Sequence, residues 1–93
     1  MVRHIVMWNL NEGLDADEVL EKMQRIFEAF SSQVPGMLSL TLHRSFAGCD
    51  LCLISKHKDP DALEAYQTFP AHLEAKKYVH SVIRERVFID FEE

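Results

Sequence analysis

The chain has 93 residues, of which 47% are hydrophobic, enough for one packed domain over residues 1–93 and too many for a disordered segment. Its 10 Lys and Arg against 15 Asp and Glu give a net charge of −5, which argues against nucleic acid as a partner. No apolar run approaches the length of a membrane span and no signal peptide is evident, so we expect a cytoplasmic protein with no membrane partner.

Residues 2–10 read as a β-strand with two apolar faces. His4, Val6 and Trp8 alternate with Ile5 and Met7 along this stretch. Successive side chains of a strand point to opposite faces, so both faces of this strand should be covered by other groups.

A helix should follow the turn after this strand. Asp15 is the expected N-cap, and Glu18 stands three residues later at the capping-box position. Pro35-Gly36 marks the end of the helical region. Apolar residues that recur at helical spacing predict a face that packs on a sheet: Val19, Met23, Ile26, Phe27, Phe30 and Val34.

Residues 37–46 and 49–57 predict two strands joined as a hairpin at Ala47-Gly48. We interpret His57, among charged residues at the end of the second strand, as a surface residue. Cys49 and Cys52 form a C-x-x-C, but a strand turns residues three apart to opposite faces and no second ligand pair exists. We interpret both as ordinary thiols.

A second helix should begin at Asp59-Pro60 and stop or bend at Pro70, which has no N–H and disfavours a helical Phe69. Without that break, Tyr66 and His72 would lie about 120° apart around one helix. The break should place the phenol and the imidazole across the mouth of one cavity. The inward face of the further helix is predicted to carry His72, Ala75, Val79 and Ile83.

Residues 85–92 predict a last strand, again apolar on both faces. The order β-α-β-β-α-β is that of a ferredoxin-like α+β fold with an antiparallel four-stranded sheet. Helices on one face leave the other face apolar and uncovered, which is rare in a monomer of this size. We therefore expect a homodimer that forms through the sheet face opposite the helices.

Several short motifs together resemble the stress-responsive dimeric α+β barrel (Dabb) family. They are Val2-Arg3-His4-Ile5-Val6, Pro35-Gly36, Ala65-Tyr66-x-x-x-Pro70-x-His72 and Phe88-Ile89-Asp90-Phe91-Glu92. The resemblance implies a protomer whose sheet joins that of a partner in a barrel. Most members have no assigned reaction, and some plant members are linked to stress responses.

The resemblance also implies candidate catalytic residues. One branch of the family cyclises a linear polyketide by aldol condensation without an organic cofactor, and its tyrosine and histidine fall on Tyr66 and His72. A first-strand histidine of that branch falls on His4. A third-strand histidine falls on Leu51, and Phe69 replaces a common histidine, so the polar set is incomplete. Some members hold a divalent ion such as Mg²⁺ on backbone carbonyls, here those of Ser31, Val34 and Met37.

The residues themselves support a cavity with acid/base capacity. A histidine titrates near neutral pH and could take a proton beside a carbonyl, while a tyrosine hydroxyl could stabilise the oxyanion that forms. No metal or nucleotide is required for this chemistry. The apolar lining is expected from Trp8, Phe27, Phe69 and Leu51.

Three functions remain open at this point. The chain could be a small dimeric protein that binds a hydrophobic ligand or takes part in a stress response without turnover. It could be a cofactor-independent enzyme acting on an apolar carbonyl compound, with His72, Tyr66 and His4 as catalytic groups. It could also be a monooxygenase of the related dimeric barrels. His4, Tyr66 and His72 could equally serve only the packing of the core.

Overall fold

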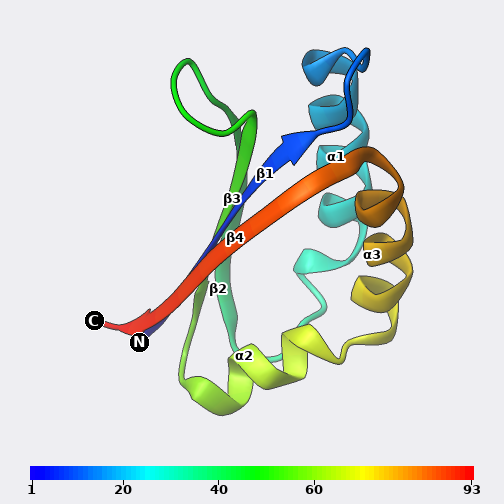
Figure 1. The fold of residues 1–93 in the computed structure, drawn as a ribbon. Helices are drawn as coiled ribbons and strands as arrows, with labels where there is room; N and C mark the ends of the chain where they lie inside the picture. The colour runs from blue at the N-terminus through cyan, green and yellow to red at the C-terminus, as the bar shows by residue number, and fades with distance from the viewer.

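A four-stranded antiparallel sheet with helices on one face makes up the computed structural model, which describes residues 1–93 (Figure 1). The strands are β1 (Val2–Leu10), β2 (Met37–Arg44), β3 (Leu51–His57) and β4 (Ile83–Glu92). The helices are α1 (Ala16–Ser31), α2 (Pro60–Gln67) and α3 (Pro70–Val82). The strand order β2-β3-β1-β4 confirms the predicted ferredoxin-like α+β fold.

The alternation of β1 decides which side chains face the helices. His4, Val6 and Trp8 are buried beneath them, while Ile5 and Met7 are half-buried on the opposite face. In the antiparallel register, His4 pairs with Ser55 of β3 and with Asp90 of β4. These pairings place polar groups of three strands on the helix-facing side of the sheet.

The helices begin where the sequence predicts. Asp15 caps α1, and its carboxylate accepts hydrogen bonds from the backbone N–H of Asp17 at 2.9 Å and of Glu18 at 3.3 Å. Asp59 caps α2 by accepting from the N–H of Ala62 at 2.8 Å. The chain is extended at the residue before Pro70, so α3 starts afresh there in a new direction.

A close contact holds the start of α2 against the turn that leads into β2. Gly36 has φ +76°, and a Cβ on it would lie 2.5 Å from the Cβ of Ala62. The carbonyl of Gly36 also accepts a hydrogen bond from the N–H of Lys58 at 2.8 Å. Only glycine allows both the positive φ and this approach without strain. The contact holds the start of the helix that carries Tyr66.

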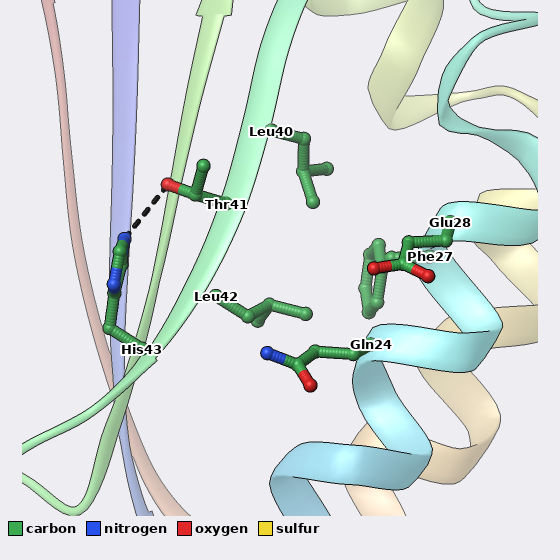
Figure 2. Close-up of a pocket in the computed structure, with 7 residues that line it drawn as sticks. All are labelled: Gln24, Phe27, Glu28, Leu40, Thr41, Leu42 and His43. Carbon is green, nitrogen blue, oxygen red and sulfur yellow. Dashed lines mark hydrogen bonds between the residues drawn. The ribbon is translucent and has the colours of Figure 1, made fainter.

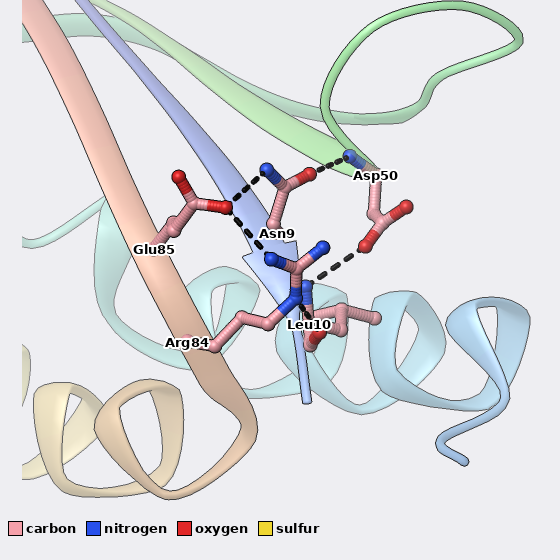
Figure 3. Close-up of polar contacts among 5 residues, drawn as sticks. All are labelled: Asn9, Leu10, Asp50, Arg84 and Glu85. Atoms are coloured by element: carbon pink, nitrogen blue, oxygen red, sulfur yellow. Dashed lines mark hydrogen bonds and ion pairs between the residues drawn. The ribbon is translucent and has the colours of Figure 1, made fainter. Parts of the chain in front are cut away.

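Hydrogen bonds and an ion pair link polar side chains at the end of the sheet where β1 ends and β4 begins (Figure 3). The carboxylate of Asp50 accepts from the N–H of Leu10 at 2.8 Å, and the N–H of Asp50 donates to Oδ1 of Asn9 at 3.2 Å. Nε of Arg84 donates to the carbonyl of Leu10 at 3.1 Å, and its Nη1 lies 2.8 Å from Glu85. The β2–β3 loop and the start of β4 are thereby joined to β1.

Three sequence-based expectations need correction. His57 is fully buried rather than on the surface, because the alternation of β3 turns it, like Ser55, to the helix-facing side. Cys49 precedes β3 instead of lying in it, although both cysteines are half-buried free thiols. Ile83 opens β4 and does not belong to the inward face of α3, which ends at Val82.

The face of the sheet opposite the helices is uncovered in the protomer (Figure 1). Apolar residues of three strands lie side by side at its centre. Ile5 pairs with Ile54 on one side and Ile89 on the other, and Met7 pairs with Val87. Val87 and Ile89 are 51% and 53% exposed. None of the helices is long and apolar enough to cross a lipid bilayer.

Candidate functional site

A cavity of about 560 Å³ lies between the helix-facing side of the sheet and the helices. We call it the Tyr66 pocket. Its lining comes from β1, β3 and β4 of the sheet and from all three helices. Among the lining residues are His4, Trp8, Phe27, Tyr66, His72 and Val79.

The Tyr66 ring is the centre of an aromatic cluster at one wall of this pocket. It is 1% exposed and stacks on the ring of His72, with the centroids 4.1 Å apart and the planes at 21°. The rings of His57 and His4 lie 5.3 Å and 6.2 Å from it. Tyr66 and His72 therefore lie face to face, and not across the cavity mouth from each other as the helix break suggested.

Burial sets the protonation of the stacked pair. Desolvation lowers the pKa of His72 from 6.5 to about 4, an effect that the positive charge of Lys76 reinforces and the carbonyls of Gln67 and Tyr66 oppose. His72 is consequently neutral at pH 7. Desolvation also raises the pKa of Tyr66, so its phenol keeps its proton and can act as a hydrogen-bond donor.

His4 has a carboxylate partner that sequence reasoning did not identify as a site residue. Its Nδ1 makes a hydrogen bond with the carboxylate of Asp90 on the neighbouring strand. A carboxylate that accepts from Nδ1–H holds the ring in the tautomer whose Nε2 is free to accept a proton. Asp90 was visible only as part of the closing motif, because its pairing with His4 depends on the register of β1 and β4.

His57 also belongs to the aromatic cluster around Tyr66, with its ring 5.3 Å from the Tyr66 ring. Its Nε2 lies 2.9 Å from the hydroxyl of Ser55, and both side chains are fully buried. Burial lowers the pKa of His57, and the nearby His4 lowers it further, while Asp90 opposes the shift. The alternation of Leu53, Ser55 and His57 was the signal that could have placed it in the core.

Three buried nitrogen atoms around the pocket make no hydrogen bond: Nε1 of Trp8, Nδ1 of His72 and Nδ1 of His57. Trp8 is 4% exposed and His72 is 8% exposed, and both line the cavity. A buried polar atom without a partner carries a free-energy cost of about 1–3 kcal/mol.

The remaining predicted lining residues fall outside the pocket. Phe69 stacks on Phe30, with the ring centroids 6.0 Å apart, and Leu51 is fully buried in the core. Neither is among the residues that line the cavity, whereas Trp8 and Phe27 are.

The backbone positions considered for a divalent ion are a poor match for Mg²⁺. The carbonyl of Ser31 accepts from the N–H of Val34 at 3.4 Å, and that of Val34 accepts from the N–H of Met37 at 3.3 Å. No carboxylate belongs to the set, and no group of three or more His, Cys, Asp or Glu in the chain is arranged to hold a metal ion. Mg²⁺ prefers octahedral oxygen ligands that include carboxylates.

A second, smaller hollow of about 230 Å³ lies between α1 and β2 (Figure 2). Leu40 and Leu42 point toward the helix, where they meet Phe27, while His43 points to the other side of the strand and bonds to Thr41 at 2.9 Å. This hollow brings no candidate catalytic residues together.

The whole chain matches one family model. The model describes the stress responsive A/B barrel domain, Dabb, and it covers residues 2–93. The chain belongs to this family. The resemblance inferred from the short motifs is therefore confirmed. A search of proteins with curated functions finds no significant match.

Solved structures share the fold of this Dabb domain at low sequence identity. A dimeric ferredoxin-like protein of unknown function from Bacteroides fragilis has a TM-score of 0.87 and 20% identity, over 99% of this chain and 95% of that one. SnoaB from Streptomyces nogalater, a cofactor-independent oxygenase, has a TM-score of 0.81 and 18% identity, over 99% and 91%. A hydroxynitrile lyase from Passiflora edulis has a TM-score of 0.81 and 15% identity, over 97% and 90%.

Proposed function

We propose that this Dabb domain is a homodimer whose Tyr66 pocket binds a small apolar ligand that contains a carbonyl group. The observation that carries the proposal is the convergence of His4, Tyr66 and His72 on one 560 Å³ cavity. Half of the residues that line it are hydrophobic, and Trp8 and Phe27 are among them. Ligand pockets usually combine an apolar lining with a few polar groups that fix orientation.

The site residues have separate roles in this proposal. The Tyr66 hydroxyl donates to the ligand carbonyl, since burial keeps the phenol protonated. The neutral His72 ring stacks on the Tyr66 ring and thereby holds the phenol in position. Trp8 and Phe27 contact the hydrocarbon part of the ligand.

The homodimer rests on a separate observation. The apolar face formed by Ile5, Met7, Val87 and Ile89 has no cover in the protomer, and similar structures are described as dimeric. The pocket lies on the helix side of the sheet, so a partner on the opposite face leaves it accessible. A role in a stress response is part of the proposal through the family alone.

Calorimetric titration with methyl heptyl ketone, a neutral apolar carbonyl compound, tests the binding function. We expect saturable binding to the unmodified protein and its loss in Leu73→Trp, which narrows the pocket from a half-exposed lining position on α3. The matched control is Glu74→Trp, on the next residue, which is exposed and outside the lining. Absence of binding, or equal loss in both variants, would contradict the proposal.

Acid/base catalysis is a second candidate function, favoured by the His4–Asp90 contact. That pairing orients a histidine that lines the same pocket as the phenol donor Tyr66. The cofactor-independent oxygenase and the hydroxynitrile lyase provide precedents for reactions on this fold. The chemistry would be removal of a proton from the carbon beside the carbonyl, with the enolate oxygen stabilised by Tyr66.

Exchange of the protons beside the ketone carbonyl with deuterated solvent measures this step. We expect the protein to accelerate exchange and Asp90→Asn to lower the rate by about 10²-fold or more, as general-base catalysis commonly requires. Glu92→Gln, on the same strand, should leave the rate unchanged. Ketone binding without accelerated exchange would rule out this second function and leave the binding function intact.

A further inference from the structure

The mouth of the Tyr66 pocket is positively charged in a chain that is acidic as a whole. Lys76 of α3 and Arg86 of β4 line it beside His80, and no Asp or Glu is among the lining residues. The chain contains 10 Lys and Arg against 15 Asp and Glu. The pocket lining is therefore positively charged, although the chain as a whole carries a net negative charge.

Neither cation has a carboxylate partner. Their neighbours do, since Lys77 lies 3.1 Å from Glu74 and Arg84 lies 2.8 Å from Glu85. Lys76 and Arg86 take part in none of the ion pairs of the chain. The Arg86 guanidinium lies over the ring of Phe88, 4.7 Å from its centroid, which restricts its orientation without neutralising its charge.

The two charges act on the interior of the pocket from opposite walls. After burial, the charge of Lys76 is the next cause that lowers the pKa of His72. Burial raises the pKa of Tyr66, and the charge of Arg86 opposes that rise. Asp90, on the same face of β4, is hydrogen-bonded to His4. The cations thus face the cavity and are free to meet a ligand.

The interior beyond the mouth suits a hydrocarbon group. Trp8, Phe27 and Val79 are each at most 5% exposed and form the apolar part of the lining. A ligand that matches both regions has one apolar part and one anionic end. A carboxylate fits this end, because lysine and arginine bind it through charge-assisted hydrogen bonds.

We propose that the Tyr66 pocket selects apolar monocarboxylates, with the carboxylate held by Lys76 and Arg86 and the hydrocarbon chain against Trp8 and Phe27. This inference rests on the proposed function, that the pocket binds a small apolar ligand, and it names the chemical class of that ligand. The carboxylate supplies the carbonyl oxygen that Tyr66 can reach.

A pair of probes that differ only at one end tests the selectivity. Octanoate and methyl heptyl ketone share the same hydrocarbon chain and carbonyl, and the O⁻ of one is replaced by CH₃ in the other. We expect octanoate to bind more tightly, and Lys76→Gln or Arg86→Gln to weaken octanoate by about fivefold each while changing ketone affinity less than about twofold. Added salt should weaken octanoate alone.

The control is Lys58→Gln, which removes an exposed cation that has no ion pair and lies outside the pocket. The melting temperature of each variant reports whether it is folded. The salt dependence of octanoate affinity in the unmodified protein is a further test that needs no variant. Equal effects of the three substitutions, or octanoate affinity that is independent of salt, would overturn the inference. Binding of the ketone without octanoate would overturn it too, and leave the proposed function standing. If neither octanoate nor methyl heptyl ketone binds, both this inference and the proposed function are wrong.

Discussion

Tyr66 is the residue on which the site depends, because its ring lies beside both candidate histidines, His72 and His4, and its hydroxyl is the candidate hydrogen-bond donor. Its stacking on His72 at 4.1 Å buries both rings, and the His4 ring stands edge-on at 6.2 Å. Burial keeps the phenol protonated and the His72 imidazole neutral. The pair therefore carries no charge at pH 7, and the Tyr66 hydroxyl keeps a proton that it can donate.

The hydroxyl of Tyr66 can be removed without removing its ring. Tyr66→Phe should weaken the binding of methyl heptyl ketone about fivefold, equivalent to one hydrogen bond of about 1 kcal/mol, while the stacked contact with His72 is retained. Titration calorimetry measures the affinity, and the melting temperature should stay nearly constant. A large fall in melting temperature with unaltered affinity would assign Tyr66 to packing alone.

His72 makes the stability of the protein depend on pH in a defined direction. Its pKa is about 4 in the folded protein against a usual value of 6.5, so the unfolded chain binds more protons between these values. Stability should fall as pH falls, and His72 should account for about 2 kcal/mol of that loss between pH 7 and 5.

Chemical denaturation of the unmodified protein and of His72→Gln at these two pH values measures this contribution. The variant should show the smaller loss, because Gln does not titrate. His57, whose pKa burial lowers as well, leaves a residual pH dependence in the variant. Parallel losses in the two proteins would show that His72 is not held neutral by the fold.

At the scale of elements, the break at Pro70 and the contact at Gly36 position the site. The break at Pro70 and the end of the first helical region at Pro35-Gly36 were predicted from the sequence, whereas the contact of Gly36 with Ala62 was not. The caps at Asp15 and Asp59 were also predicted correctly, because caps depend on local chemistry.

What depends on tertiary geometry was not predictable from local pattern. The flanking charges suggested a surface position for His57, but alternation along β3 buries it. The contact of Asp90 with His4 requires the register of β4 on β1, and the face-to-face stacking of Tyr66 on His72 requires the angle between α2 and α3. The sequence could name Tyr66 and His72 from the break at Pro70, and His4 through a family resemblance, but not their arrangement.

The close approach at Gly36 predicts a large effect for a small substitution. Gly36→Ala should lower the free energy of unfolding by roughly 2–4 kcal/mol, because the added Cβ combines strain at φ +76° with a clash against Ala62 at 2.5 Å. Urea denaturation measures the change. Gly48→Ala is the control, since it has φ +89° and open space around the added Cβ, and should lose only about 1 kcal/mol.

A second substitution separates the clash from the strain. Ala62→Gly in the Gly36→Ala background removes the atom that the new Cβ meets. It should recover part of the lost stability despite the lower helix propensity of glycine. Equal destabilisation by Gly36→Ala and Gly48→Ala would show that α2 is free to move away.

At the scale of the whole molecule, the two faces of the sheet have different surroundings. Its helix-facing side forms the pocket, and its other side is apolar from Met7 to Ile89 without any cover. A monomer rarely exposes an apolar surface of this continuity. We therefore propose that one face binds the ligand and that the other binds a second copy of the chain.

A charge on the uncovered face should break the dimer. Met7→Glu or Ile5→Glu would bury an unpaired carboxylate in the interface, so we expect dissociation or unfolding. Sedimentation velocity at micromolar concentration should show a dimer for the unmodified protein and for Leu14→Glu, whose site is exposed at the start of α1. A well-folded monomer of the unmodified protein would contradict the proposal.

The most direct test of the central claim is an isotope-filtered nuclear Overhauser measurement on labelled protein with bound methyl heptyl ketone. We expect nuclear Overhauser contacts from the hydrocarbon chain of the ligand to the indole N–H of Trp8 and to the rings of Phe27 and Tyr66. Contacts to Ile89 or Val87 on the opposite face of the sheet, with none to Trp8, would show that the cavity around Tyr66 is not the binding site.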